Sequence, residues 1–253
     1  MKEKIELNSN AVLLRKRLGE DPSSPVDVFS IINSLSNFTL IYYPMSDRIS
    51  GMCARIEGAE NLIAINSNLT YGRQRFTTAH ELYHLFFQSN FTNVVCAKDL
   101  ESVKDVEEKN ADSFASYFLA PYEALKIFIS ESLKKENTPL TVQDVVKIEQ
   151  HFGMSRQAIL IRLQNERDIT ADFANQLKTN VIQSARRLGY DDRLYIPTSR
   201  DKQFLTTGSY IELVEKVREK DLISQGKFEE FLLDAFRSDI VYNLSTDAEE
   251  MYD

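Results

Sequence analysis

The feature that most constrains this chain is a five-residue stretch, His80-Glu81-Leu82-Tyr83-His84, which holds two of its three histidines. Each residue of an α-helix advances by about 100°, so two histidines four residues apart project from the same face. One metal ion can accept a nitrogen from each imidazole, which is the pattern of zinc-binding helices. Glu81 lies at the edge of that face, where its carboxylate can take a proton from water without ligating the metal. The stretch predicts a zinc site with His80 and His84 as ligands and Glu81 as the base.

A second helix is expected from Glu107 to Leu119, ending before Pro121. Its apolar residues recur every three or four positions and form one stripe that packs on the histidine helix. Glu108 and Asp112 flank this stripe, so Glu108 is the predicted third ligand of the metal. Asp112 is predicted to contact the far nitrogen of a ligating histidine. Glu107 is the alternative ligand, and both glutamates can also simply stabilise the first turn through the helix dipole.

The segments before the histidine helix are typical of a small sheet. Phe38 to Tyr43, Ile49 to Ile56 and Leu62 to Asn66 are rich in β-forming residues, and turn residues separate them. Such runs predict strands. We therefore expect an α+β fold in which a small antiparallel sheet packs on the metal-site helices.

Residues 136–170 are predicted to form a helical unit with the rhythm of a helix-turn-helix. Thr141 caps one helix, Gly153 ends it and Ser155 caps a second one. In DNA-binding modules the second helix reads the bases. The polar residues of this helix that would do so are Arg156, Gln157 and Arg162. Residues 138–168 nevertheless hold four basic and four acidic side chains, which favours a structural or partner-binding unit.

Residues 171–253 are predicted as a helical extension without a chemical motif. Ser209 and Glu212 have the spacing of a capping box, and the residues that follow carry apolar stripes at helical spacing. The extension has 16 acidic and 11 basic residues, so it would suit a basic partner protein. A role in packing or in dimerisation is the alternative.

Composition limits the class of protein. The 253 residues are 43% hydrophobic, and the chain has no run of 18 apolar residues and no apolar segment after its charged start, so we expect neither a membrane span nor an export signal. Two cysteines, Cys53 and Cys96, are too few for a disulfide framework and favour a reducing cytoplasm. The net charge of −8 argues against strong direct binding of nucleic acid.

Two stretches of this sequence together resemble the ImmA/IrrE family of bacterial zinc metallopeptidases. They are Arg75-Phe76-Thr77-Thr78-Ala79-His80-Glu81-Leu82-Tyr83-His84 and Glu108-Lys109-Asn110-Ala111-Asp112-Ser113-Phe114-Ala115, the latter closing at Leu119-Ala120-Pro121. The resemblance covers roughly residues 25–170 and implies a zincin-like metallopeptidase domain over residues 1–135. It also implies zinc bound by His80, His84 and Glu108, with Glu81 as the base. Tyr83 departs from the small residue that is usual in the family, and Asn110 stands where a further acid is common.

The resemblance implies a zinc endopeptidase that cleaves a helix-turn-helix transcriptional repressor and so releases mobile-element or stress-response genes. The alternative is a regulatory protein that controls a repressor or a toxin-antitoxin partner by contact alone. Glu81 favours the enzyme, since a structural metal site has no use for that acid. The side chains considered as donors to the oxyanion of the reaction are Tyr83, Tyr117, Tyr122 and His151, among which the sequence does not choose.

Overall fold

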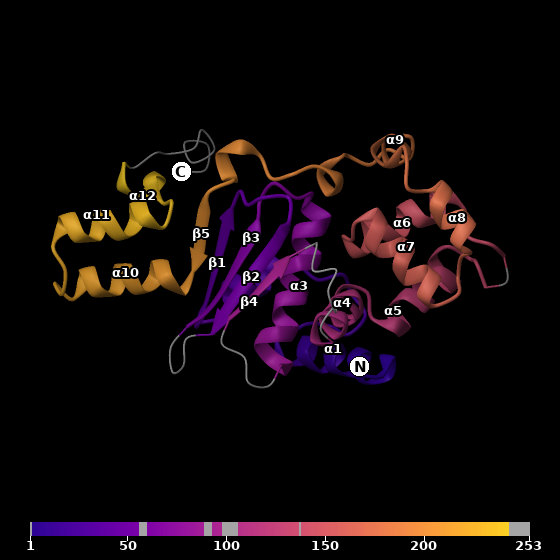
Figure 1. The fold of residues 1–253 in the computed structure, drawn as a ribbon, viewed down its shortest axis with the longest axis horizontal. Coiled ribbons are helices and arrows are strands. Elements are labelled where there is room, and N and C mark those ends of the chain that lie inside the picture. The colour runs from indigo at the N-terminus through magenta and orange to yellow at the C-terminus, as the bar shows by residue number, and fades with distance from the viewer. Residues whose placement is uncertain (1, 56–59, 89–92, 98–105, 137, 243–253) are drawn as a thin grey trace.

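A five-stranded sheet forms the centre of the molecule in the computed structural model, which describes residues 2–55, 60–88, 93–97, 106–136 and 138–242 (Figure 1). The strands are β1 (Phe38–Tyr43), β2 (Ile49–Arg55), β3 (Asn61–Asn66), β4 (Asn93–Ala97) and β5 (Leu205–Gly208). They lie in the order β4-β2-β3-β1-β5. Helices surround this sheet, which confirms the predicted α+β class.

The sheet is mixed, whereas the sequence favoured a purely antiparallel one. β1 and β3 are parallel, and every other pair of neighbours is antiparallel. The reason lies in β3, whose residues Ile63, Ala64 and Ile65 are all buried. A strand covered on both faces belongs at the centre of a sheet, so β3 is inserted between β1 and β2. The predicted antiparallel pairing was therefore wrong for β1 and β3.

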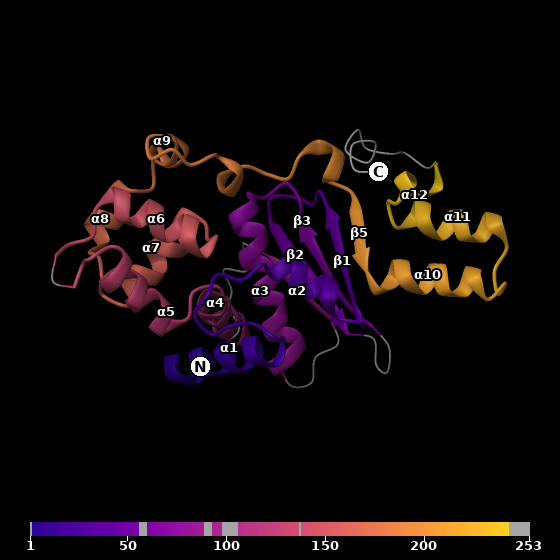
Figure 2. The same cartoon turned by 180° about the vertical axis from the view of Figure 1, so that it is seen from behind.

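The helices form three groups around the sheet. The first group comprises α1 (Lys4–Arg17), α2 (Val28–Ser34), α3 (Tyr71–Phe87) and α4 (Val106–Leu119). The second comprises α5 (Tyr122–Ile127) with the π-helix Phe128–Ser132, α6 (Val142–Phe152), α7 (Arg156–Asn165), α8 (Ala171–Gln176) and α9 (Val181–Arg186). After short 3-10 turns at Arg193–Tyr195 and Arg200–Lys202, the third comprises α10 (Ser209–Glu219), α11 (Gln225–Asp234) and α12 (Ser238–Val241). Figures 1 and 2 show the second and third groups on opposite sides of the sheet.

Helix α3 is the most enclosed helix of the first group. It packs against β2 and β3 on one side and against α4 on the other, and every residue from Thr77 to Leu85 is buried. A helix that is buried all round has little freedom to shift, because neighbours fill the space on each side. The side chains that α3 carries are therefore held on a rigid element.

The cap and turn residues predicted for the helix-turn-helix-like unit are confirmed. The Thr141 side chain accepts a hydrogen bond from the Asp144 amide and forms a capping box at the start of α6. Gly153 ends α6 in the left-handed conformation, and the Ser155 side chain caps α7. Turn and cap residues act within one or two turns of chain, which is why the sequence alone identifies them.

Arg156 and Arg162 of α7 are buried and contact other residues of the protein. Arg156 is buried, forms an ion pair with Glu149 and donates to the Leu177 carbonyl. Arg162 is buried with its guanidinium carbon 3.9 Å from the centre of the Tyr117 ring, and its Nε lies 3.3 Å from Glu166. Arg156 joins α7 to α6 and to the end of α8, and Arg162 joins α7 to α4, so neither is presented to a partner such as DNA.

The region predicted as a helical extension also supplies a strand. β5 pairs antiparallel with β1, from Thr39 opposite Gly208 to Tyr42 opposite Leu205. The open edge of β1 needs backbone partners, and this distant segment provides them. The expected capping box at Ser209 and Glu212 is wrong, because Ser209 lies inside α10 and its hydroxyl contacts Thr39 instead. No described helix has the length and apolarity needed to cross a membrane.

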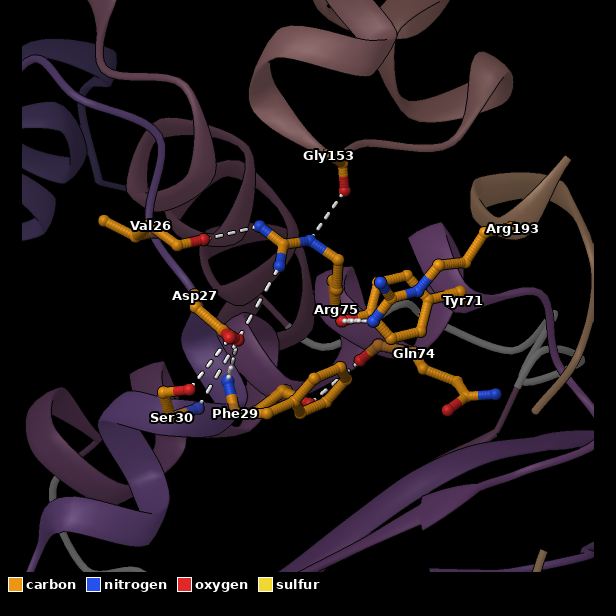
Figure 3. A network of polar contacts seen from close by, with 10 residues as sticks. Val26, Asp27, Phe29, Ser30, Tyr71, Gln74, Arg75, Gly153 and Arg193 are labelled. Atoms are coloured by element: carbon orange, nitrogen blue, oxygen red, sulfur yellow. Dashed lines mark hydrogen bonds and ion pairs between the residues drawn. The ribbon is translucent and has the colours of Figure 1, made fainter. Parts of the chain in front are cut away.

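Arg75 ties the helical unit to α3, as Figure 3 shows. Its Nε donates to the Gly153 carbonyl at 2.9 Å, and its Nη2 donates to the Val26 carbonyl at 2.6 Å. A carboxylate oxygen of Asp27 lies 3.9 Å from Nη1. A buried guanidinium with these partners joins three segments: the start of α2, helix α3, and the turn between α6 and α7.

We predict that Gly153→Ala destabilises the protein more than a glycine substitution of the same backbone type elsewhere. Gly153 has φ of +63°, and a Cβ there would lie 2.7 Å from Arg75 Nε. We expect a loss of about 2–4 kcal/mol, combining left-handed strain with a displaced hydrogen bond to a charged group. Gly189→Ala is the control, since Gly189 has φ of +83° but no atom within 4 Å of the added Cβ. Chemical denaturation measures both, and equal losses would contradict the role given to Arg75.

Candidate metal centre

Helices α3 and α4 bring three potential metal ligands together, here called the His-His-Glu group: His80, His84 and Glu108. His80 Nε2 lies 3.1 Å from His84 Nε2. Glu108 faces both rings, with one oxygen 3.3 Å from His80 Nε2 and the other 3.4 Å from His84 Nε2. Both histidines are buried and Glu108 is partly exposed, so the group can be reached from one side.

The outer nitrogens of both imidazoles contact hydrogen-bond acceptors. His80 Nδ1 lies 3.0 Å from Asp112 Oδ1, which confirms the contact predicted from the sequence. His84 Nδ1 lies against the side-chain oxygen of Gln88. An acceptor at Nδ1 keeps a proton there, so in the neutral ring the Nε2 lone pair points into the His-His-Glu group. Two lone pairs and a carboxylate that converge in a buried place require a cation.

The spacing of the group fits zinc. Zinc binds nitrogen and oxygen ligands at about 2.0–2.1 Å, which sets neighbouring ligand atoms of a tetrahedron about 3.3 Å apart. The separations of 3.1, 3.3 and 3.4 Å agree with that value. Two imidazoles and one carboxylate are also a ligand set of catalytic zinc, in which a fourth position stays open. His80, His84 and Glu108 are therefore suited to hold this ion.

In the absence of a metal, a proton can supply the required positive charge. Burial lowers the pKa of His80, but hydrogen bonds with Asp112 and Glu108 outweigh that effect and raise the pKa to about 10. Burial raises the pKa of Glu108, while the hydrogen bond and charge of His80 outweigh it and hold this pKa below its ordinary value. A metal ion must displace the proton on His80 to bind.

Glu81 is fully buried next to this group. Its two carboxylate oxygens have no hydrogen-bond donor within the described residues. Strand β2 passes so close that a Cβ on Gly51 would lie 3.2 Å from Glu81 Oε1. Buried carboxylates are ordinarily paired, because an unpaired buried charge is strongly unfavourable. An unpaired carboxylate held against a glycine on a rigid helix is typical of a catalytic residue rather than a structural one.

Glu107, the alternative ligand, faces another partner. The Tyr83 hydroxyl donates to Glu107 Oε2 at 2.6 Å. Burial, followed by this hydrogen bond, raises the pKa of Tyr83. Of the two neighbouring glutamates, Glu108 is thus the one that joins the His-His-Glu group. The large residue at position 83 has a local role, since its hydroxyl holds Glu107.

The four side chains considered as oxyanion donors lie elsewhere. Tyr83 touches the His84 ring, but its hydroxyl is bound to Glu107. The Tyr117 hydroxyl donates to Glu166, the His151 ring stacks on Phe128, and Tyr122 lies under Lys126. In the part of the chain that the structure describes, none of the four directs a hydrogen bond into the His-His-Glu group.

Comparison with protein families assigns residues 42–164 to the IrrE N-terminal-like domain, Peptidase_M78. This segment contains Glu81 and the whole His-His-Glu group. Residues 42–164, and with them the metal centre, belong to the ImmA/IrrE family. No curated protein matches it. Membership of a peptidase family supports a metallopeptidase type of function for the ImmA/IrrE domain.

Two residues near the His-His-Glu group, Arg73 and Gly51, were not predicted from the sequence. Arg73 lies seven residues before His80 on α3, a spacing that places both on one face, so the helical period offered a signal for it. Gly51 lies on the neighbouring strand, where an added Cβ would be 3.2 Å from Glu81 Oε1. No local sequence pattern predicts such an approach between a strand and a helix.

Removal of the Asp112 carboxylate is expected to weaken metal binding. Asp112 holds His80 Nδ1, and loss of such an outer contact typically lowers metal affinity about 10–100-fold. We predict a loss of that size for Asp112→Ala and a smaller one for Asp112→Asn, which keeps an acceptor oxygen but loses the charge. Competition with a chelator measures the zinc affinity of each variant. Asp172→Asn on α8 is the control, and an affinity equal to wild type in Asp112→Ala would remove Asp112 from the site.

Proposed function

We propose that this ImmA/IrrE protein is a zinc-dependent endopeptidase. The observation that carries the proposal is the meeting of three ligand atoms, 3.1 to 3.4 Å apart, beside the buried and unpaired carboxylate of Glu81. A structural zinc site closes its fourth position with another protein ligand. The described residues offer only these three ligands together, and the acid beside them has the character of a base.

The roles of the side chains follow from their surroundings. When bound, zinc supplies a Lewis acid that polarises the scissile carbonyl and makes water easier to deprotonate. Glu81 accepts the proton of the attacking water and passes it to the leaving nitrogen, a transfer for which its unpaired oxygens are suited. Asp112 fixes the tautomer of His80, and Gln88 does the same for His84. Because α3 is buried and rigid, Glu81 and both histidines keep fixed positions relative to one another.

The proposed substrate is a helix-turn-helix transcriptional repressor in the cytoplasm, whose cleavage releases mobile-element or stress-response genes. The ImmA/IrrE membership supports the peptidase part of this proposal, and the choice of a repressor rests on the resemblance described above. The excess of acidic residues in 171–253, 16 against 11 basic ones, favours a basic partner such as a DNA-binding protein. The low cysteine content favours a reducing compartment.

The test is co-expression with the repressor encoded beside the gene for this protein, followed by intact mass measurement of the repressor. The proposal expects two fragments whose masses add up to the parent plus one water. A repressor that co-purifies intact in a stable complex would instead favour the regulatory protein that acts by contact alone.

A further inference from the structure

A groove of about 430 Å³ is lined by residues of α3, α4 and α7 and lies beside the metal centre. Asp112, which contacts His80, forms part of its wall on α4, next to Ser113. Arg73 and Phe76 line it from α3, and Ile161 lines it from α7. Because Asp112 of this wall contacts His80, a peptide that binds in the groove would lie next to the metal centre.

Three cationic side chains line this groove, Arg73, Lys109 and Arg162, and Arg73 is the one on the helix that carries both histidines. Its Nη2 donates to the Ser50 hydroxyl at 3.3 Å, while its Nε is buried and has no hydrogen-bond partner within the described residues. The carboxylate whose charge acts on Arg73 is that of Asp112, which already contacts His80. Arg73 forms no ion pair among the described residues, so the part of its guanidinium that lines the groove is suited to a ligand that brings a carboxylate.

The α7 side of the groove has apolar surface at Ala158 and Ile161, next to polar residues such as Gln157 and Asn165. Ile161 is 50% exposed although it is a large hydrophobic residue, and it lines the same groove as Phe76 and Ala158. An exposed apolar wall facing a cation matches a side chain with an apolar stem and an anionic end. Glutamate has this form, and aspartate is its shorter equivalent.

The position of Arg73 on α3 indicates which substrate residue it meets. Seven residues separate it from His80, which is about 10 Å along a helix. An extended peptide advances about 3.3 Å per residue, so this length corresponds to about three substrate residues. Arg73 therefore lies too far from the metal centre to act on the reacting carbonyl, but it is within reach of a neighbouring side chain.

We propose that this groove is a specificity site in which Arg73 binds an acidic side chain of the substrate about three residues from the scissile bond. The inference rests on the proposed peptidase function, and it adds a substrate preference to it. Arg73 acts on the substrate and not on the metal, so its loss changes which peptide is cleaved rather than whether cleavage occurs.

Binding of short peptides tests the groove without any need for cleavage. The probes are fluorescein-labelled hexaglutamate and hexaglutamine, titrated with the full chain and followed by fluorescence anisotropy. The net charge of −8 repels an acidic peptide in general, so tighter binding of hexaglutamate needs a local cationic site. We expect hexaglutamate to bind at least about tenfold more tightly than hexaglutamine, as one charge-assisted hydrogen bond allows. Arg73→Gln should remove most of the difference, and Arg73→Lys should keep a larger part of it.

The matched control is Arg187→Gln, which removes an exposed arginine of the same charge outside the groove. Titration of both the zinc-loaded and the zinc-free protein separates binding by Arg73 from binding of carboxylates to zinc. Equal affinity for the two peptides in the wild type, or an unchanged preference in Arg73→Gln, would overturn the inference.

Cleavage of a peptide library by the zinc-loaded protein, read by mass spectrometry, gives the second measurement. We expect aspartate and glutamate to be enriched two to four residues from the cut, and Arg73→Glu to replace this preference by one for lysine and arginine. Cleavage without any acidic preference would overturn the inference and leave the peptidase intact. No cleavage, together with retained hexaglutamate preference, would instead overturn the proposed function.

Discussion

Glu81→Gln is expected to keep the fold and the zinc of this protein and to lose nearly all of its cleavage activity. Glutamine has the shape of glutamate but cannot accept a proton from water, and a general base typically contributes about 10²–10⁴-fold to the rate. Both Glu81 oxygens are buried without a donor, so the neutral amide also relieves an unpaired charge. We therefore expect an unfolding temperature equal to or above that of the wild type.

The measurement is the initial rate of repressor cleavage, with zinc content and unfolding temperature taken from the same preparations. Glu123→Gln, an exposed glutamate on α5, is the matched control and is expected to cleave at the wild-type rate. Cleavage by Glu81→Gln at the parent rate would mean that another group acts as the base.

Glu108→Gln is expected to lose zinc, because it removes the only anionic ligand of the His-His-Glu group. The wild type should hold one zinc per chain, and the variant should lose more affinity than the 10–100-fold that an outer contact typically contributes. Glu107→Gln is the control, since its carboxylate binds the Tyr83 hydroxyl, and it should keep its zinc. Elemental analysis of protein purified without added metal measures both variants.

Zinc binding should also depend on pH in a defined direction. The pKa of His80 is about 10 in the metal-free protein, well above its ordinary value, so a proton occupies the nitrogen that zinc needs. Zinc therefore displaces a proton, and its affinity should rise as the pH rises.

Retained zinc in Glu108→Gln, together with zinc loss in Glu107→Gln, would reverse the assignment of the third ligand.

The residues of the metal centre could be predicted from the sequence because they depend on the period of two helices. His80 and His84 share a face of α3 by their spacing, and Asp112 follows Glu108 by one turn on α4. Only the packing of α3 against α4 joins the two pairs, and the apolar stripe of α4 predicted that as well. The choice between Glu107 and Glu108 required the structure, since neighbouring positions differ by only about 100° in direction.

Contacts between segments far apart in the sequence could not be predicted from the sequence. β5 pairs with β1 across more than 160 residues, as in the pairing of Thr39 with Gly208, and nothing local near either segment marks that partnership. The cap residues of α6 and α7 were predictable, whereas the burial of Arg162 against Tyr117 was not. An arginine on a helix looks the same in a sequence whether it faces solvent or another helix.

The most direct test of the peptidase is the intact mass of the neighbouring repressor after incubation with four samples: zinc-loaded wild type, wild type stripped of metal, stripped wild type reloaded with zinc, and zinc-loaded Glu81→Gln. We expect a pair of fragments that add up to the parent plus one water in the first and third samples only. Fragments of equal yield in all four would contradict it by locating the cleavage outside this site. An uncut repressor in all four would contradict the assignment of this repressor as the substrate.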